Sequence, residues 1–120
     1  MSSEKLLKLI SDEDAEYVDI RFTDPRGKLQ HVTVMSDQVD ADFIDEGFMF
    51  DGSSIAGWKA INESDMLMKP DFNRTFIDPF YAQPTLSIFC DILDPITGAP
   101  YDRDPRSTAK GALSYMKNLG

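Results

Sequence analysis

The residues best suited to chemistry lie within one segment, 49–66, whose sequence is MFDGSSIAGWKAINESDM. Asp51 supplies a carboxylate that can attract a cation or accept its proton, and Ser54 supplies a hydroxyl that can orient that cation. Gly52 and Gly57 permit backbone angles that a Cβ would disfavour. Long connections with little periodicity are usually functional or disordered, and the apolar residues within this one argue against disorder. The sequence therefore predicts an ordered loop shaped for chemistry.

Asp51 also has a plainer interpretation. An aspartate ahead of a Gly-Ser-Ser run can cap its own backbone in an Asx-turn, without any chemical role. The run matches neither a Walker loop nor a dinucleotide fingerprint, so it does not predict a phosphate-binding site. The pattern alone leaves the reactive carboxylate and the turn cap both open.

The remaining candidate residues favour structural roles. His31 falls on the opposite face of its predicted strand from Val32 and Val34, and no Ser-His or Cys-His spacing can be built around it, so we expect an ordinary surface histidine. Cys90 alternates with apolar residues and is expected to be a small core residue. The acids within 37–46 lack the spacing of a calcium loop, which favours a solvated helix face and predicts no metal site.

The composition is typical of a single globular domain. The chain has 120 residues, of which 42% are hydrophobic and 28% charged, and its net charge is -9. An acidic chain without a basic stripe is a poor partner for nucleic acid or an anionic membrane. No apolar run approaches the roughly 18 residues of a membrane helix, and no hydrophobic stretch has the length of a signal peptide. The single cysteine excludes an internal disulfide and fits a reducing compartment, so we expect a cytoplasmic location.

Strands are predicted on both sides of the candidate loop. Residues 17–34 alternate in polarity around an Asp-Pro-Arg-Gly turn and predict a β-hairpin. Shorter strands are expected at 66–68, where Pro70 would end the strand, at 76–77 and at 86–92.

Two helices are expected to accompany these strands. One is a short N-terminal helix capped by Ser3, and the other covers 36–46, with Ser36 as its N-cap and Gly47 as its stop. Hairpin, helix and further strands in this order predict an α+β domain of the β-grasp (ubiquitin-like) type, with a mixed sheet covered by a helix.

The last segment predicts a helix that has little core to meet. Asp104 is its N-cap, a proline takes the first helical position, and Leu113 and Met116 belong to an apolar stripe. We expect residues 103–120 to be the first helix of a truncated catalytic domain, and residues 1–102 to form the β-grasp domain.

Several stretches of the chain carry a family resemblance. They read VDIRFTD at 18–24, GK at 27–28, QHVT at 30–33, MFDGSSIAGW at 49–58, ESDM at 63–66, IDPF at 77–80, CDI at 90–92 and YDRDPR at 101–106. Together and in this order they resemble the N-terminal region of bacterial type I glutamine synthetases, along nearly all 120 residues. The chain is therefore identified as similar to the N-terminal β-grasp domain of that family.

The resemblance implies an ATP-dependent glutamate–ammonia ligase. Enzymes of this family make L-glutamine from glutamate and ammonia through γ-glutamyl phosphate, in active sites between adjacent subunits of a two-ring dodecamer. The N-terminal domain forms one wall of each site, and the C-terminal catalytic domain forms the other. Mg or Mn and ATP are expected for the full-length enzyme, with no cofactor or metal within this chain. Its partners would be its own C-terminal domain, neighbouring subunits, ammonium and glutamate.

The resemblance also implies roles for particular residues. Asp51 would help bind ammonium and take its proton, with Ser54 supporting it in the same pocket. Asp65 resembles a residue that contacts the flap closing over glutamate, and Trp58 a loop residue that packs on the neighbouring subunit. The family's metal, ATP and glutamate ligands belong to the C-terminal domain, so we expect the 120-residue chain alone to be inactive. The alternatives are a stand-alone β-grasp interaction module and the same domain of a related glutamate–amine ligase.

Overall fold

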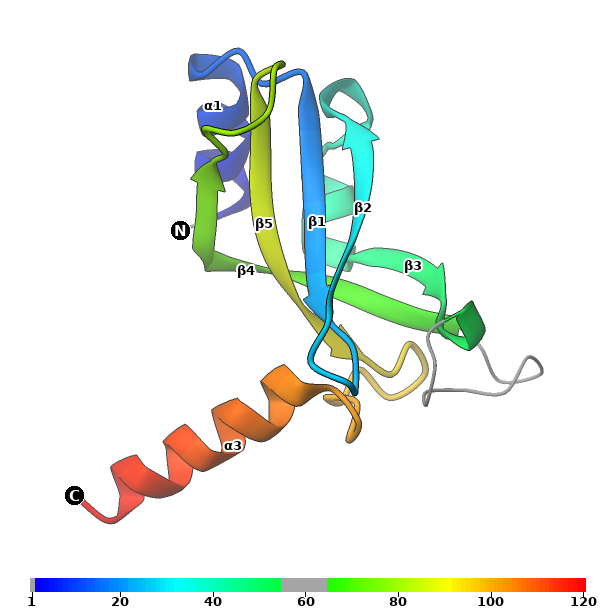
Figure 1. Cartoon of the computed structure of the whole chain (residues 1–120), viewed down its shortest axis with the longest axis vertical. Helices are drawn as coiled ribbons and strands as arrows, with labels where there is room; N and C mark the ends of the chain where they lie inside the picture. The colour runs from blue at the N-terminus through cyan, green and yellow to red at the C-terminus, as the bar shows by residue number, and fades with distance from the viewer. Residues whose placement is uncertain (1, 55–64) are drawn as a thin grey trace.

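A five-stranded mixed sheet organises the chain. The computed structural model describes residues 2–54 and 65–120, and its strand order is β2-β1-β5-β4-β3 (Figure 1). β1 (Tyr17–Thr23) and β2 (Leu29–Met35) form the antiparallel hairpin at one edge. β5 (Thr85–Leu93) lies in the centre, parallel to β1 and antiparallel to β4 (Asp65–Ile77), and β3 (Phe48–Asp51) pairs with β4 at the other edge. The predicted hairpin and mixed sheet are confirmed.

One face of the sheet packs against two helices. α1 (Ser3–Asp12) buries Leu6 and Ile10, and α2 (Ala41–Glu46) buries Ile44. The N-cap of α1 is one residue earlier than predicted, because the Ser2 hydroxyl accepts the hydrogen bond from the Lys5 amide. The sheet residues of this core come from alternate positions of the central strands, as period-two burial requires: Val18, Ile20, Phe22, Met66, Met68, Leu86, Ile88, Cys90 and Ile92.

The prediction of one helix over 36–46 is wrong. A 3-10 turn covers Ser36–Gln38, and α2 begins only after Asp40, whose carboxylate accepts a hydrogen bond of 2.8 Å from the Phe43 amide. Between the two, Val39 adopts extended backbone and is 7% exposed. Burial of this one apolar side chain therefore interrupts the helix that local pattern predicts.

The two short strands predicted at 66–68 and 76–77 are one strand, β4. Its pairing with β5 runs on to Pro70↔Cys90 and resumes at Thr75↔Ile88, with a shift of register between them. Proline cannot donate to the ladder, and an irregular stretch of this kind lets the strand continue past it.

Gly47 joins α2 directly to β3. It is the predicted stop of α2, and its φ of 88° lies in the region that favours glycine. A Cβ at this position would lie 2.9 Å from the Met68 carbonyl oxygen and 3.0 Å from Leu67 Cδ1. The absence of a side chain therefore lets β3 begin against β4.

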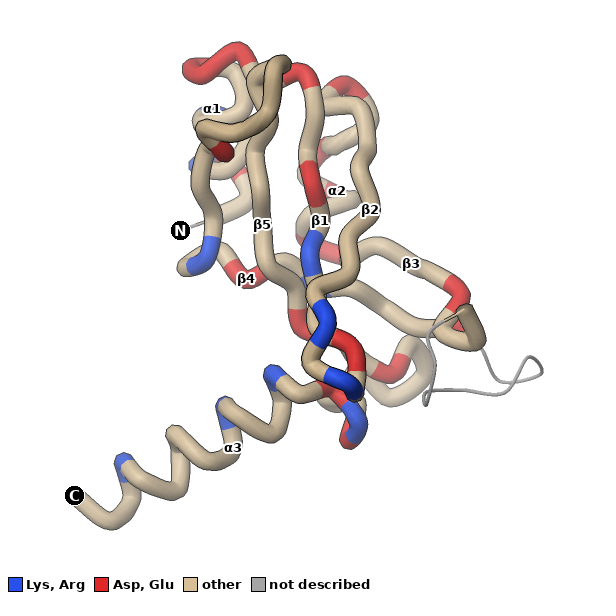
Figure 2. The backbone as a smooth tube through the Cα atoms, viewed as in Figure 1, with Lys and Arg blue, Asp and Glu red and all other residues tan. Residues whose placement is uncertain are grey.

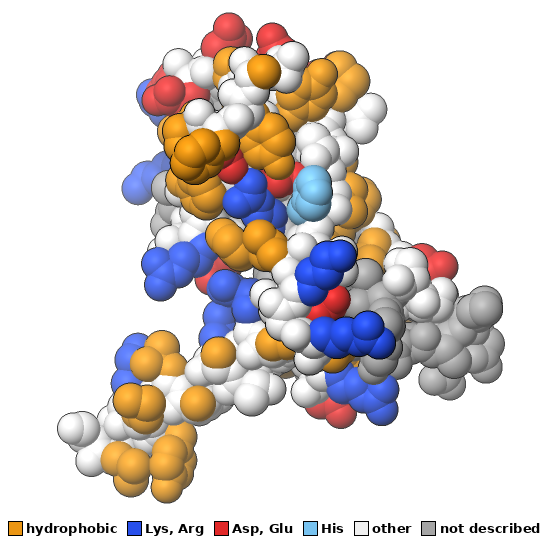
Figure 3. Space-filling view, viewed as in Figure 1, with side chains coloured by type: hydrophobic (Ala, Val, Ile, Leu, Met, Phe, Trp, Pro, Cys, Tyr) orange, Lys and Arg blue, Asp and Glu red, His pale blue; other side chains and the backbone are white. Residues whose placement is uncertain are grey.

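A polar cluster lies on the other face of the sheet, around Asp19, which is fully buried. One carboxylate oxygen accepts hydrogen bonds from Arg21 Nε at 2.8 Å and Tyr81 Oη at 3.3 Å. The other oxygen accepts from Thr33 Oγ1 at 2.9 Å and lies 2.7 Å from His31 Nδ1. The side chain of His31 is 55% exposed, as the single pale blue residue in Figure 3 shows, so the predicted surface position is correct. Its ring also contacts the buried carboxylate of Asp19.

Arg21 links this cluster to the connection between β4 and β5. Its Nη2 donates a hydrogen bond to Asp78 Oδ2 at 2.7 Å, and its Nε donates to Asp19. Burial by itself would raise the pKa of Asp19, but the hydrogen bonds from Arg21, His31 and Thr33 outweigh it and leave that pKa below its ordinary value. The charged form of Asp19 therefore stabilises the fold.

We expect Gly47→Ala to lower the free energy of unfolding by about 1–3 kcal/mol, because alanine is strained at this backbone angle and meets the Met68 carbonyl. Urea unfolding followed by circular dichroism measures the change. Gly111→Ala is the matched control, since a Cβ there meets nothing within 4 Å. Equal stability of the Gly47→Ala chain and the parent would contradict the role of Gly47.

We expect Asp19→Asn to destabilise the chain by on the order of 2 kcal/mol near neutral pH, because the buried carboxylate loses charged hydrogen bonds. Since folding lowers the pKa of Asp19, this stabilisation is complete above the unfolded-state value of about 3.9 and is lost as pH falls through the folded-state value. The stabilities of parent and variant should therefore begin to converge only below about pH 4, as the pH falls through the lowered pKa of Asp19. Asp12→Asn, on the exposed side of α1, is the control, and a difference that is constant with pH would exclude Asp19 as the titrating group.

Candidate functional site

The candidate residues lie at the tip of the β3–β4 hairpin. β3 pairs with β4 from Phe48↔Met68 to Asp51↔Asp65, which is the last pair. β5 accompanies β4 only as far as Leu67↔Leu93. The tip therefore extends beyond the end of β5, away from the two helices of the core (Figure 1).

The prediction that 49–66 is a single loop is wrong at both ends. Met49, Phe50 and Asp51 belong to β3, and Asp65 begins β4. Side chains of a strand alternate between its two faces, and in β3 Phe48 and Phe50 are half-buried while Met49 and Asp51 are exposed. The ring of Phe50 packs 5.2 Å from that of Phe22, which anchors the hairpin on the core. The strand pattern thus presents Asp51 to solvent on a rigid base.

The backbone turns immediately after Asp51. A 3-10 turn covers Gly52–Ser54, and Gly52 is buried. Asp51 Oδ1 accepts hydrogen bonds from the Ser53 amide at 2.9 Å and from Ser53 Oγ at 2.6 Å. These are the contacts of the turn cap that the sequence left open, and they orient the carboxylate of an exposed side chain. Capping and ligand binding are therefore compatible at Asp51.

The two serines make different contacts with Asp51. Ser54 Oγ donates to the main-chain carbonyl of Asp51 at 2.7 Å, so it supports the turn rather than the carboxylate. Ser53, to which the sequence reasoning gave no role, supplies the hydroxyl that contacts the carboxylate. The Asp-x-Ser spacing of an Asx-turn was the signal that could have identified it.

Asp65 lies directly opposite Asp51 across the hairpin and is also exposed. Like charges at opposed cross-strand positions repel, and this repulsion favours a cation close to the tip. Trp58, the fourth candidate, lies outside the described residues. The structure thus brings Asp51, Ser54 and Asp65 together at one end of the sheet.

Other side chains that could react or bind a ligand lie elsewhere. Cys90 is fully buried, and burial raises the pKa of its thiol, so it is the inert core residue predicted. Within residues 2–54 and 65–120, no three His, Cys, Asp or Glu side chains come close enough to hold a metal ion.

Acidic positions are spread over helices, loops and strand ends, and basic positions occur on the β1–β2 hairpin and along α3 (Pro105–Asn118) (Figure 2). None of the described helices is long and apolar enough to cross a membrane.

Comparison with known proteins gives a consistent result. Residues 14–95 match the family described as glutamine synthetase, β-grasp domain. The chain is 61% identical over 114 residues to a glutamine synthetase of Cereibacter sphaeroides, covering 95% of this chain and 24% of that protein. It is 55% identical to a glutamine synthetase of Escherichia coli K12 over all of this chain and 26% of that protein.

A solved structure agrees in fold. The cryo-EM structure of Plasmodium falciparum glutamine synthetase superposes with a TM-score of 0.88 at 25% identity, covering 99% of this chain and 23% of that one. The chain thus spans about a quarter of the length of the relatives it matches. Its sheet order, its alternating core and its matched residues lead to one conclusion: the chain belongs to the glutamine synthetase family and corresponds to the N-terminal β-grasp domain of that family.

Proposed function

We propose that this chain is the ammonium-site domain of a glutamate–ammonia ligase. The full-length protein would make L-glutamine from glutamate and ammonia, with ATP hydrolysis and γ-glutamyl phosphate as the intermediate. The single observation that carries the proposal is the position of Asp51, an exposed and hydrogen-bonded carboxylate at the tip of a hairpin anchored on the core. The identity of 55% and 61% to glutamine synthetases supports it.

The chemistry requires a group that handles ammonium. Ammonium is abundant near neutral pH but has no lone pair, whereas ammonia is nucleophilic but scarce. Asp51 would attract ammonium by charge and accept one of its protons, and the ammonia released would attack the acyl carbon with loss of phosphate. Because a carboxylate is a weaker base than ammonia, the proton transfer is favourable only when it is coupled to that attack.

The hydrogen bonds around Asp51 suit this role. Ser53 holds one carboxylate oxygen by two contacts, so the carboxylate has a fixed orientation before ammonium arrives. Asp65, opposite on β4, adds negative charge that attracts the cation. We assign Ser54 to the support of the turn, through its bond to the Asp51 carbonyl.

The other wall of the site would come from elsewhere in a multi-subunit enzyme. The hairpin tip projects from the sheet and offers one side of a pocket, so a neighbouring subunit would supply the remainder. We propose the dodecameric arrangement for the full-length protein, with Asp65 near the flap over glutamate and Trp58 at the subunit contact. The described residues provide no set of metal ligands, so we propose that the C-terminal domain would bind Mg or Mn and ATP.

Two further assignments accompany this proposal. We place residues 103–120 with the segment that leads into the catalytic domain. The exposure of Leu113 and Met116 in α3, 52% and 64%, and of its C-cap Leu119, 71%, supports this. We assign the protein to the cytoplasm, a reducing compartment in which a free Cys90 is ordinary. A stand-alone interaction module is not favoured, since the relatives are glutamine synthetases about four times as long.

Replacement of Asp51 by asparagine in the full-length protein tests the role of its charge. We expect glutamine formation from ammonium to fall by about 10²–10⁴-fold, the usual loss for a general base. Transfer of the γ-glutamyl group to hydroxylamine, which is largely uncharged at neutral pH, should fall much less, and ATP affinity should stay constant. Steady-state kinetics with both nucleophiles provide the measurement.

Asp37→Asn, an exposed charge on the 3-10 turn Ser36–Gln38, is the matched control and should leave both activities unchanged. An equal loss with ammonium and hydroxylamine in Asp51→Asn would contradict a role in deprotonation. The turn cap would then be the only function of Asp51.

The 120-residue chain should form no glutamine in the presence of ATP, glutamate, ammonium and Mg. The physical reason is that the described residues offer neither a phosphate-binding loop nor a set of metal ligands. Mass-spectrometric detection of glutamine, with a full-length glutamine synthetase as positive control, checks this expectation. ATP-dependent glutamine formation by the purified chain would show that the catalytic ligands lie within it.

A further inference from the structure

The start of α3 is built into the sheet. Asp104, its N-cap, is fully buried, and its Oδ2 accepts a hydrogen bond of 3.0 Å from the Ile92 amide of β5. Its Oδ1 accepts from the Arg106 amide at 3.1 Å, within the first turn of the helix. One carboxylate therefore satisfies backbone donors of both β5 and α3, and it fixes the point at which the helix leaves the sheet.

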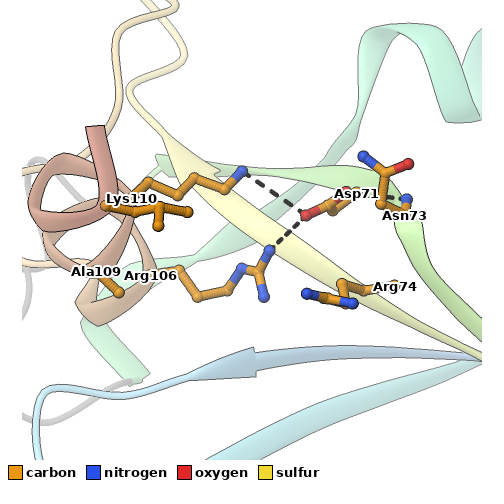
Figure 4. Close-up of a pocket in the computed structure, with 7 residues that line it drawn as sticks. Asp71, Asn73, Arg74, Arg106, Ala109 and Lys110 are labelled. Carbon is orange, nitrogen blue, oxygen red and sulfur yellow. Dashed lines mark hydrogen bonds and ion pairs between the residues drawn. The ribbon is translucent and has the colours of Figure 1, made fainter. Parts of the chain in front are cut away.

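Two cations one turn apart then connect α3 to two strands. Arg106 Nη2 lies 2.6 Å from Asp71 Oδ2 on β4 (Figure 4). Arg106 Nε lies 3.2 Å from Asp91 Oδ1 on β5. Lys110, at position i+4 and thus on the same helix face, contacts both carboxylates as well, Asp91 closely and Asp71 at 3.8 Å. Four charged side chains from three elements therefore form one network.

The irregular stretch of β4 places one of the two carboxylates. Asp71 follows Pro70 within the segment where pairing to β5 shifts register, and Asp91 is the register partner of Lys69. Side-chain exposure is 15% for Asp71, 20% for Asp91 and 21% for Arg106. The pairs of Arg106 are therefore partly buried and have more effect than ordinary surface pairs, whereas the Lys110 side chain is 52% exposed.

Packing does not hold the helix in the same way. A pocket of about 330 Å³ lies between α3 and β4, with Arg74, Ala109 and Leu113 among its lining residues. Beyond Lys110 every residue of α3 is exposed, and the helix projects away from the sheet (Figures 1 and 3). The Asp104 cap and the four-residue network are therefore the polar contacts through which the first turns of α3 reach β4 and β5.

We propose that Asp71, Asp91, Arg106 and Lys110 form an ionic joint that sets the direction of α3 relative to the sheet. Asp104 fixes the origin of the helix, and the two cations fix its orientation by reaching two separate strands. Asp71 lies on β4, the same strand whose first residue faces Asp51. The joint therefore also sets the angle between α3 and the hairpin tip. Arg106 and Lys110 are positioning residues, and their effect does not depend on the proposed function.

Distances between two spin labels in the 120-residue chain test the joint. The labels are attached at Met35→Cys on β2 and Leu119→Cys after α3, which are 52% and 71% exposed. The chain without added cysteines controls for labelling of the buried Cys90. The parent should give one narrow distance peak. Arg106→Gln combined with Lys110→Gln should lose that single peak, while circular dichroism retains the sheet and helix signals.

Two variants separate a specific joint from a general effect of charge. Lys117→Gln removes a cation from the last turn of the same helix and should keep the narrow peak. Arg106→Lys keeps the charge but loses the planar fork that bonds both carboxylates. Its peak should therefore be broader than that of the parent and narrower than that of the double variant. A narrow peak in the double variant, or the same loss of the peak in Lys117→Gln, would overturn the proposal.

Two measurements protect the test against a double variant that fails to fold. The first is the single variant Lys110→Gln, which alters a side chain that is 52% exposed. The second is the spin-labelled chain with Arg106 and Lys110 intact, measured at 1 M salt, where the screening length is about 3 Å. The joint predicts a broader peak in both cases. An unchanged peak in both would mean that Asp104 alone directs the helix, and the proposal would be rejected.

Discussion

The structure depends on the pairing of β1 with β5 at the centre of the sheet. This parallel pair brings Val18 beside Leu86 and Ile20 beside Ile88, and all four side chains are almost fully buried. Burial of each such side chain contributes about 1.5–3 kcal/mol to folding. A shift of one residue would move these side chains out of the core, so their burial fixes the register of both strands. Because the side-chain period is two, the same register places Asp19 on the opposite face, where only the surrounding hydrogen bonds make its burial tolerable.

The hairpin tip and the start of α3, for which we propose roles, occupy the periphery of this centre. The β3–β4 hairpin extends past the end of β5 and presents Asp51, while the start of α3 attaches across the outer parts of β4 and β5. Both features rely on β4, whose register shift after Pro70 accommodates a residue that cannot donate to the ladder. A rigid centre with projecting, exposed ends is the arrangement expected of a domain that contributes to sites shared with other parts of a larger protein.

Local patterns predicted several elements because their causes are local. Alternating residues over 17–34 predicted the hairpin, and Gly47 predicted the end of α2 through its need for positive φ. Predictions failed where distant groups decided the outcome. Val39 leaves the helical conformation to reach the core, and β4 passes Pro70 because β5 pairs with it on both sides of the irregular stretch. Residue types cannot report such long-range contacts.

The candidate site divides in the same way. The sequence by itself determined that Asp51, Ser54 and Asp65 fall in one polar segment, and it determined the family through its matching stretches. Only the tertiary structure decided that Asp51 faces Asp65, that Ser53 rather than Ser54 contacts the carboxylate, and that His31 meets buried Asp19. It also decided that Arg106 reaches Asp71, 35 residues away in the chain. The physical reason is that hydrogen bonds and ion pairs depend on the separation of atoms in space, which the packing of strands sets and the order of residues does not.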